Sequence, residues 1–210
     1  MHKMLFWLAV MIPVIYGQTG WRDVSPGQSV HFTDIYFHNS SDGYAVSPYL
    51  TTSILKTTDS GENWTSQSIG GNSPVAIDFY NSTYGAATAY GYPAFATQDG
   101  GDNWAIRNLS YTTYDCCMVS DNIAVFVGTS GYVRRTTDGG VTFSSIATGW
   151  NVQINSVHFY NTSVGWLCSN DGGVGKSTNG GETWSMASIT DYAPSLHEMQ
   201  SIYFISQSVG

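Results

Sequence analysis

Carboxylates recur along this chain at a regular spacing, which raises the question of whether they carry out chemistry. Asp59, Asp99 and Asp138 each stand third in a short motif, and Asn179 takes the same place in a fourth copy. The four copies read TTDSGENW, TQDGGDNW, TTDGGVTF and STNGGETW. An amide does not exchange protons as a carboxylate does, so an acid or base at this position would not survive replacement by Asn. The fourth copy therefore favours a structural role for the motif.

Each position of the motif suits a tight turn between two strands. The Asp or Asn oxygen can accept hydrogen bonds from backbone N–H groups ahead of it, and the Thr or Ser hydroxyl can satisfy further groups. Glycine two positions later allows a positive φ. The aromatic residue can pack against a neighbouring sheet, where burying a large ring contributes about 3 kcal/mol. The motif residues are Thr57, Asp59, Gly61, Trp64, Thr97, Asp99, Gly101, Trp104, Thr136, Asp138, Gly140, Phe143, Ser177, Asn179, Gly181 and Trp184.

The copies lie about 40 residues apart, and a period of that length indicates a repeat architecture. A strand-like run with a polar turn precedes each copy, as in IYFHNSSDGYAV, IDFYNSTYGAAT and VHFYNTSVGWLC. CCMVSDNIAVFV occupies the same place with the glycine lost. Four short strands per repeat predict an all-β propeller built of four-stranded antiparallel blades. A sandwich of irregular strands would not explain the fixed period.

Composition limits the partners that this chain can bind. It has 7 Lys and Arg against 15 Asp and Glu, for a net charge of -8. So few cations argue against nucleic acid and against adhesion to anionic lipid. The sequence shows no metal-ligand spacing, phosphate loop or Ser-His-Asp arrangement, so we expect no metal and no cofactor.

The N-terminal run predicts export. Residues 1–17 read as a secretory signal peptide, because one Lys is followed by roughly a dozen apolar residues and then Gly17. A buried N-terminal strand or a retained anchor is the alternative. We expect a secreted, periplasmic or cell-surface propeller over 18–210, with four full repeats and partial repeats at both ends. Because IYFISQSVG stops within a hairpin, we expect a C-terminally truncated piece of a closed ring.

Three cysteines follow the predicted leader, at Cys116, Cys117 and Cys168. An odd number with an adjacent pair is neither a disulfide framework nor a zinc site. All three lie in apolar, strand-like runs, where buried free thiols are common. A bridge from Cys168 to one of the pair remains an alternative.

Turn geometry predicts two faces, of which one carries the candidate ligand site. In an up-and-down meander the turns alternate between the two ends of a blade, so the N-S/T turns and the motif turns share one face. The middle loops and the connections between repeats share the other, which we call the loop face. It carries the variable sequence at 47–53, 89–94, 128–132, 169–174 and 187–199. Variable loops on a rigid scaffold are the usual place for ligands, and tyrosine rings suit sugars or peptides; alternatively these rings only cover the blade ends. The candidate ligand residues are Tyr49, Tyr90, Tyr92, Tyr132, Asp171, Tyr192 and His197.

The motif resembles the Asp-box, or BNR repeat, of sialidases, sortilin-type receptors and xyloglucanase-type hydrolases. With the V-x-F-x-N-x-x-x-G-W run at 157–166, the chain is most similar to photosystem II assembly-factor propellers, which implies a seven-bladed ring. The resemblance covers 21–210. It implies that the Asp-box residues are structural and lie away from the ligand site.

Three functions remain open. A non-catalytic binding or scaffold module for a protein or glycan is the first. A secreted glycosidase is the second; paired carboxylates would be needed, and Asp171, Asp191 and Glu198 are the only acid–base candidates, because Asp34 and Asp115 share a structural repeat register. A photosystem II assembly-type factor, which the resemblance implies would bind a membrane-protein partner through an arginine-rich patch, is the third. A sialidase would need three convergent arginines, and the chain offers Arg22, Arg107, Arg134 and Arg135.

Overall fold

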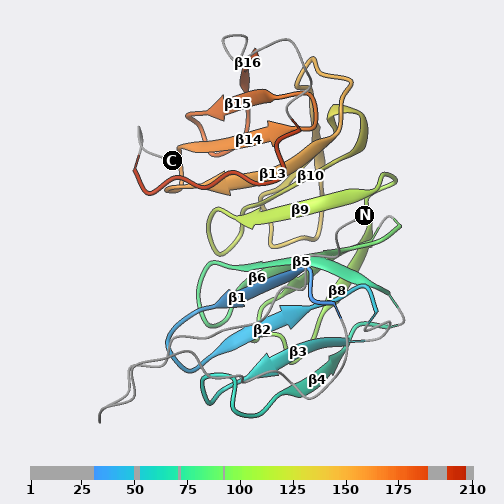
Figure 1. The fold of residues 1–210 in the computed structure, drawn as a ribbon, viewed down its shortest axis with the longest axis vertical. Coiled ribbons are helices and arrows are strands. Elements are labelled where there is room, and N and C mark those ends of the chain that lie inside the picture. Colours follow the sequence, from blue (N-terminus) through green and yellow to red (C-terminus); the bar gives the residue numbers. More distant parts are fainter. Residues whose placement is uncertain (1–30, 50–52, 71, 92, 189–197, 207–210) are drawn as a thin grey trace.

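The chain forms four separate β-sheets, each a four-stranded antiparallel meander (Figure 1). The computed structural model describes residues 31–49, 53–70, 72–91, 93–188 and 198–206. Strands that follow one another in the sequence are neighbours in each sheet, as the hairpin pattern predicted. The all-β prediction with one four-stranded sheet per repeat is therefore confirmed. The predicted signal peptide lies outside the described residues.

The sheets are numbered in chain order. Sheet 1 contains β1 (Asp34–Phe37), β2 (Gly43–Val46), β3 (Ser53–Thr57) and β4 (Thr65–Ser68), and sheet 2 contains β5 (Pro74–Phe79), β6 (Gly85–Ala89), β7 (Pro93–Thr97) and β8 (Ala105–Asn108). Sheet 3 contains β9 (Thr113–Met118), β10 (Ala124–Gly128), the short 3₁₀ turn η1 (Thr129–Gly131), β11 (Val133–Thr136) and β12 (Ser144–Ile146). Sheet 4 contains β13 (Ile154–Phe159), β14 (Gly165–Ser169), β15 (Gly173–Ser177) and β16 (Ser185–Ser188).

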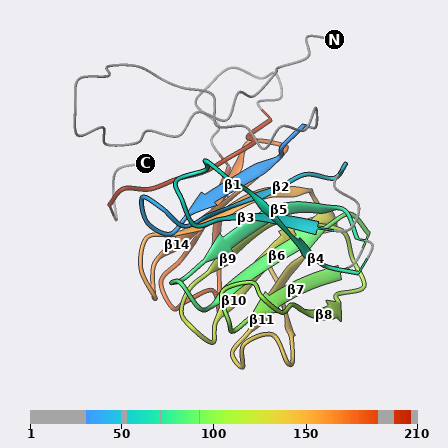
Figure 2. The same cartoon turned by 90° about the horizontal axis from the view of Figure 1, so that it is seen from below.

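The first strands of the sheets lie side by side. β1 contacts β5, β5 contacts β9, and β9 contacts β13. We call these the innermost strands, because the other strands of each sheet step away from them, as Figure 2 shows for β5 to β8. Second strands are buried along their whole length, whereas β4, β8 and β12 are largely exposed. Such burial is expected when sheets stack face to face, because a middle strand is then covered on both sides.

Each of the three junctions between described sheets has its own apolar core. Sheets 1 and 2 meet through a cluster that includes Tyr44, Ile54 and Phe79. Sheets 3 and 4 meet through a valine-rich cluster, and sheets 2 and 3 through a cluster in which sheet 2 contributes mainly alanine. At this junction the small side chains of sheet 2 pack against larger ones, such as Phe126, from sheet 3.

The glycine that opens most second strands serves close packing. Phe79, at the end of β5, pairs with Gly85, at the start of β6. A Cβ added to Gly85 would lie 2.5 Å from the Phe79 ring, so a larger residue would displace the ring. In sheet 3 the corresponding pair is Met118 and Ala124. The lost glycine of CCMVSDNIAVFV is thus accompanied by a flexible side chain in place of the ring.

Backbone hydrogen bonds confirm the two predicted faces. On one, which we call the Asp-box face, each Asp-box turn donates an N–H to the preceding N-S/T-type turn, through Ser60 to Ser41, Gly100 to Thr83, Gly139 to Asn122 and Gly180 to Ser163. On the loop face, middle loops donate to the connections between sheets, through Tyr90 to Ser73, Thr129 to Thr112 and Asn170 to Gln153.

Residues 198–206 lie against sheet 4 as β5 lies against sheet 1. Phe204 stacks on Trp166 with ring centroids 3.8 Å apart, as Phe79 stacks on Tyr44 at 4.1 Å. The Phe204 carbonyl contacts His158 Nε2 at 3.1 Å. The partial repeat predicted at the C-terminal end thus makes the contacts of an innermost strand.

Candidate functional site

Each Asp-box is a turn held by its own hydroxyl and carboxylate. In the first copy, the Thr57 hydroxyl donates to Asp59 Oδ1 (2.9 Å) and accepts the Gly61 N–H (2.9 Å). Asp59 Oδ1 also accepts the Asn63 N–H at 2.8 Å. Gly61 has a φ of 85°, which other residues resist. Equivalent bonds join Thr97, Asp99, Gly101 and Asn103, then Thr136, Asp138, Gly140 and Thr142, then Ser177, Asn179, Gly181 and Thr183.

The Asp-box carboxylates are held in their ionised form. Hydrogen bonds from the Thr142 side chain and backbone lower the pKa of Asp138 to about 2. The Asn63 backbone N–H and side chain lower the pKa of Asp59, and the Asn103 side chain and backbone lower that of Asp99. A carboxylate with a lowered pKa is a poor proton donor at neutral pH.

The Asp-box aromatic residue packs first on its own sheet. The Trp104 ring meets Phe79 edge-on at 5.9 Å, and both belong to sheet 2. Trp104 also borders the core between sheets 1 and 2. The predicted packing against a neighbouring sheet therefore describes only part of its contacts. Edge-on pairs of the same kind join Trp64 to Phe37, Phe143 to Phe126 and Trp184 to Phe159.

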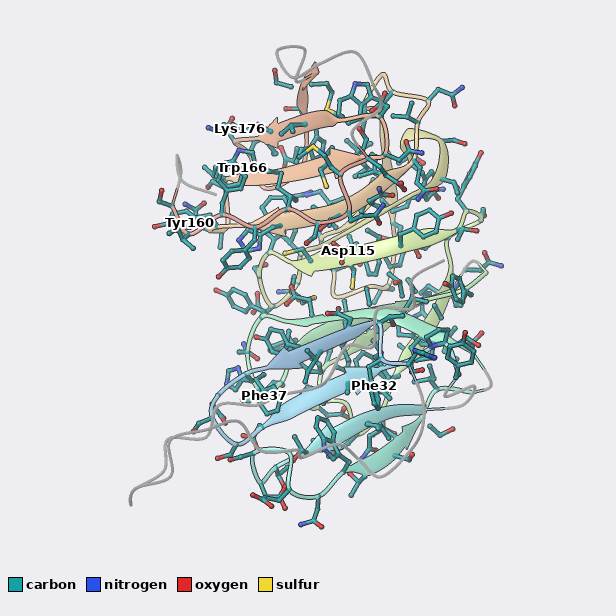
Figure 3. The ribbon with its side chains drawn as sticks, in the orientation of Figure 1. Phe32, Phe37, Asp115, Tyr160, Trp166 and Lys176 are labelled. Atoms are coloured by element: carbon teal, nitrogen blue, oxygen red, sulfur yellow. The ribbon has the colours of Figure 1, made fainter. Side chains whose placement is uncertain are left out.

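A polar side chain on each innermost strand binds the backbone of the next innermost strand. Asp34 Oδ2 accepts the Ile77 N–H at 2.9 Å. Asp115 lies on β9 toward β13, at the centre of Figure 3. Asp34 and Asp115 thus hold neighbouring sheets together. The further bonds of this series join Asp78 to Met118 (2.7 Å), Asp115 to Val157 (2.9 Å) and Ser156 to Ile202 (3.4 Å).

Burial shifts the titration of these inner groups toward neutral pH. Desolvation raises the pKa of Asp34 to about 6 and that of Asp78 and Asp115 to about 7. It also raises the pKa of the Cys116 and Cys117 thiols well above the usual range. Because the thiolate is the nucleophile, these cysteines are poorly reactive at neutral pH.

All three cysteines are buried free thiols, so the alternative of a bridge from Cys168 is wrong. No group of three metal-ligating side chains occurs among the described residues. In the same part of the chain, we find no helix of the length and apolarity that crossing a bilayer requires.

Two of the predicted loop-face tyrosines are well exposed. Tyr49 is 66% exposed and Tyr90 is 55% exposed. They come from the middle loops of sheets 1 and 2, and His31 lies beside the Tyr49 ring at 5.7 Å. The candidates Tyr92, Tyr192 and His197, together with Asp191, lie outside the described residues.

The third described tyrosine, Tyr132, turns into the protein. Its hydroxyl donates to the Leu109 carbonyl and accepts Arg134 Nε, while Arg134 Nη1 donates to Ser145. The Arg134 guanidinium carbon lies 4.9 Å from the centre of the Tyr132 ring. Tyr111, 46% exposed, covers the same ring at 4.2 Å. Tyr132 is thus partly buried, and Tyr111 is the more exposed ring of the pair.

The structure describes two of the three carboxylates considered as acid–base groups, Asp171 and Glu198, and the Met199 N–H next to Glu198 donates to the Ser169 carbonyl at 3.3 Å. Asp171 Oδ1 accepts hydrogen bonds from the Ser169 hydroxyl and the Gly173 N–H, within the β14–β15 turn. Glu198 is exposed at the start of the last described segment. No hydrogen bond joins Asp171 to Glu198 in the part of the chain that the structure describes.

The described arginines do not converge. Arg135 reaches sheet 4 through the Gly180 carbonyl. Arg134 holds Tyr132 within sheet 3, and Arg107 Nη1 donates to the carbonyl of its own neighbour Ile106. A cluster of three arginines, as the sialidase resemblance requires, is absent from the described residues.

Sequence reasoning missed Tyr111 and Arg134. Tyr111 lies in the connection between sheets 2 and 3, which shares the loop face with the loops that were considered. Its position in LSYTT, directly after a strand, was the available signal. Arg134 gave no such signal, because its place in β11 does not reveal a contact with Tyr132.

Comparisons with known structures identify the fold. A structure described as YCF48 bound to D1 peptide matches with a TM-score of 0.65 and 14% identity, over 87% of this chain and 60% of that chain. YCF48 from Cyanidioschyzon merolae matches with a TM-score of 0.62 and 18% identity, over 95% and 63%. The chain thus spans about three fifths of the YCF48 chains.

Hydrolase structures show the same fold. An ancestral GH74 enzyme matches with a TM-score of 0.64 and 21% identity, over 80% of this chain and 25% of that chain. The GH74 xyloglucanase from Xanthomonas campestris matches with a TM-score of 0.62 and 10% identity, over 79% and 34%.

A scan of protein-family models finds no match, and neither does a search of curated proteins. At these identities the structural matches report on the fold alone. With its four Asp-box sheets, the chain is an all-β, partial propeller that is structurally similar to YCF48 and to the BNR-type propellers of GH74 enzymes.

Proposed function

We propose that this protein is a secreted, non-catalytic binding module that engages a polypeptide partner through its loop face. The observation that carries the proposal is the exposure of Tyr49, Tyr90 and Tyr111 on loops from three successive parts of the propeller. Tyrosine contributes a large, rigid contact area at low entropic cost. Loops held by stacked sheets can present such rings in a fixed arrangement.

The exposed tyrosines of the opposite face have a different origin. Tyr80 and Tyr160, 47% and 44% exposed, follow the terminal Phe of β5 and β13 at the same repeat position. Their shared repeat position explains the exposure of both tyrosines. Tyr49, Tyr90 and Tyr111 do not share a repeat position, so the repeat does not account for them.

A polypeptide is the favoured class of partner because a similar propeller, YCF48, has a structure with a bound D1 peptide. Catalysis is the weaker candidate, because the Asp-box carboxylates and Asp171 are engaged in turns. GH74 enzymes share the fold, but no arrangement of described residues favours hydrolysis here.

The proposal can be tested with a random peptide library displayed on phage. Peptides selected on the wild-type protein should lose at least about tenfold in affinity, or 1.4 kcal/mol, for the variant Tyr49→Ala/Tyr90→Ala/Tyr111→Ala. They should retain their affinity for the matched control Tyr80→Ala/Tyr160→Ala, which removes rings of similar exposure from the Asp-box face.

Three results would contradict the proposal. One is an equal loss of affinity in the control variant. Another is failure to select any peptide while a glycan array shows binding. The last is turnover of xyloglucan or a sialoside by the wild-type chain that disappears in Asp171→Asn, Asp191→Asn or Glu198→Gln.

A further inference from the structure

A cationic side chain closes the junction between sheets 1 and 2 on the Asp-box face. Lys56 stands directly before the first Asp-box and reaches across to sheet 2. Its Nζ donates to the Gly100 carbonyl at 2.7 Å and to Asp102 Oδ1 at 2.9 Å. Both acceptors belong to the next Asp-box turn. One cation therefore binds a backbone carbonyl and a carboxylate of the neighbouring repeat.

The junction between sheets 3 and 4 is closed in the same way. Arg135, at the position equivalent to Lys56, donates from Nε to the Gly180 carbonyl at 2.8 Å. Its Nη2 lies 3.4 Å from Glu182 Oε1. The two junctions use different cations but equivalent acceptors, so the Asp-box turn provides a general receptor for a basic side chain.

The junction between sheets 2 and 3 lacks this closure. The cation is replaced by Ala96, and the acceptor carboxylate is replaced by Val141, which is 58% exposed. The equivalent carbonyl is that of Gly139, and no described side chain or N–H donates to it. Gln98 supplies the side-chain atom closest to a Cβ built on Gly139, and that atom is a neutral amide nitrogen.

A surface groove of about 230 Å³ lies at this junction. Its apolar lining includes Ala96, Ala105 and Val141, and Asp99 and Gly139 also border it. The volume is below the range of roughly 300–1,000 Å³ that is usual for small-molecule sites. Toward the core, the adjoining space shrinks to about 10 Å³. The groove thus has room for one side chain at the surface rather than for a buried ligand.

The charged side chains that line the groove are Asp99 and Arg107. Asp99 borders it with a lowered pKa and so carries a negative charge at neutral pH. Asp121 borders the adjoining space beneath it. Lys56 and Arg135 are already engaged at their own junctions. Arg107, which also lines the groove, turns Nη1 back to the Ile106 carbonyl.

We propose that this groove binds a lysine or arginine side chain presented by a partner polypeptide. The alkyl stem would lie on Ala96, Ala105 and Val141, and the cationic head would donate to the Gly139 carbonyl near Asp99. The partner would thereby supply the contact that Lys56 and Arg135 make within the chain. The site lies on the Asp-box face and does not depend on the loop-face function proposed above.

The probe is a soluble heptapeptide, acetylated and amidated, with Gly and Ser around one central Lys, Arg or norleucine. Norleucine keeps the aliphatic stem of lysine without its charge. In ¹H–¹⁵N spectra of the whole chain, the Lys and Arg peptides should shift the amide signals of Gly139 and Gly140. The norleucine peptide should bind at least about tenfold more weakly.

Two variants distinguish binding in the groove from non-specific attraction of a cationic peptide to the acidic Asp-box face. Ala96→Lys/Val141→Asp leaves the net charge unchanged and rebuilds the internal closure, so binding should be lost. Arg135→Ala/Glu182→Val also preserves net charge and opens the next junction, so new shifts should appear at Gly180 and Gly181. If the first variant does not fold, Ala105→Arg, at an exposed position on β8, fills the groove instead and should also abolish binding.

The proposal is overturned if the Lys and Arg peptides shift no signals of the wild-type chain. It is overturned equally if norleucine binds as well as lysine, or if the folded groove-filling variant binds like the wild type. A failure of Arg135→Ala/Glu182→Val to gain shifts would show that the Asp-box turn is not a general receptor.

Discussion

At the scale of single residues, Asp138 and Asn179 occupy equivalent places with different chemistry. Both accept a backbone N–H from the residue four positions later, Thr142 and Thr183, through Oδ1. Both also accept the hydroxyl of the preceding Thr or Ser. The turn therefore needs an oxygen acceptor and not a charge.

This equivalence gives a prediction for Asp99. Asp99→Asn should cost less than about 1 kcal/mol in the free energy of unfolding, because Asn103 can turn its amide as its partner changes. Asp99→Ala should cost about 1–2 kcal/mol, because the Asn103 N–H and the Thr97 hydroxyl lose their acceptor. Urea denaturation measures both. Equal costs for the two variants would contradict this account of the turn.

At the scale of elements, the innermost strands and the Asp-box turns respond to pH in opposite directions. Asp34, Asp78 and Asp115 have pKa values raised to about 6, 7 and 7, so the stability they contribute is present below about pH 4 and is lost as pH rises through 6–7. Asp138, with a pKa lowered to about 2, contributes stability above about pH 4 that is lost on acidification toward 2. These groups together favour maximum stability near about pH 4.

Single substitutions should separate the two contributions. In urea denaturation at a series of pH values, Asp115→Asn should flatten the fall in stability between about pH 4 and 7, because the buried group no longer titrates. Asp138→Asn should leave that range unchanged and flatten the loss below pH 4. An unchanged profile for Asp115→Asn between about pH 4 and 7 would exclude Asp115 as a source of the pH dependence.

The contacts that Lys56 and Arg135 make with the next sheet lead to a prediction about Arg135. Arg135→Ala should cost about 1–2 kcal/mol of unfolding free energy, since the partly buried guanidinium donates to the Gly180 carbonyl. Glu182→Ala should cost less than about 0.5 kcal/mol, because the Glu182 side chain is 60% exposed and its ion pair is screened by water. The two values come from denaturant midpoints of the single variants. A larger cost for Glu182→Ala than for Arg135→Ala would refute this ranking.

Most of the architecture could be predicted from the amino-acid sequence because the sequence repeats. The Asp-box turns, the four sheets and the two faces follow from a motif whose copies share a spacing. The repeat did not predict which position of each innermost strand binds the next strand. Asp34 and Asp115 occupy the same position in their innermost strands. Asp78 makes the same kind of bond to the next innermost strand, but it lies two residues further along its own strand. Tyr132 was predicted to be an exposed loop residue, but its hydroxyl donates to the Leu109 carbonyl and its ring is partly buried.

At the scale of the whole molecule, residues 198–206 continue the series of innermost strands. The Ile202 N–H donates to Ser156 Oγ, as the Ile77 N–H donates to Asp34. Trp166 and Lys176 lie together on neighbouring strands of sheet 4, with Tyr160 on the same side (Figure 3). Phe204 of this segment covers the Trp166 ring, which is buried.

Hydrogen exchange tests the placement of this segment. In the 210-residue chain, the Ile202 amide should exchange more slowly than an unstructured amide, because it donates to a partly buried hydroxyl. Trp166→Ala should speed its exchange by removing the ring on which Phe204 stacks. Tyr160→Ala, which removes an exposed ring, is the control. Free exchange of Ile202 in the wild-type chain would contradict the placement.

The bonds between sheets also have a consequence for the order in which the protein acquires its structure. They join residues separated by 43 positions for Asp34 and Ile77, 44 for Lys56 and Gly100, and 45 for Arg135 and Gly180. When each repeat contacts only its neighbours, structure can spread from one repeat to the next. A chain emerging from the ribosome could therefore complete each sheet against the one before it, without waiting for distant sequence.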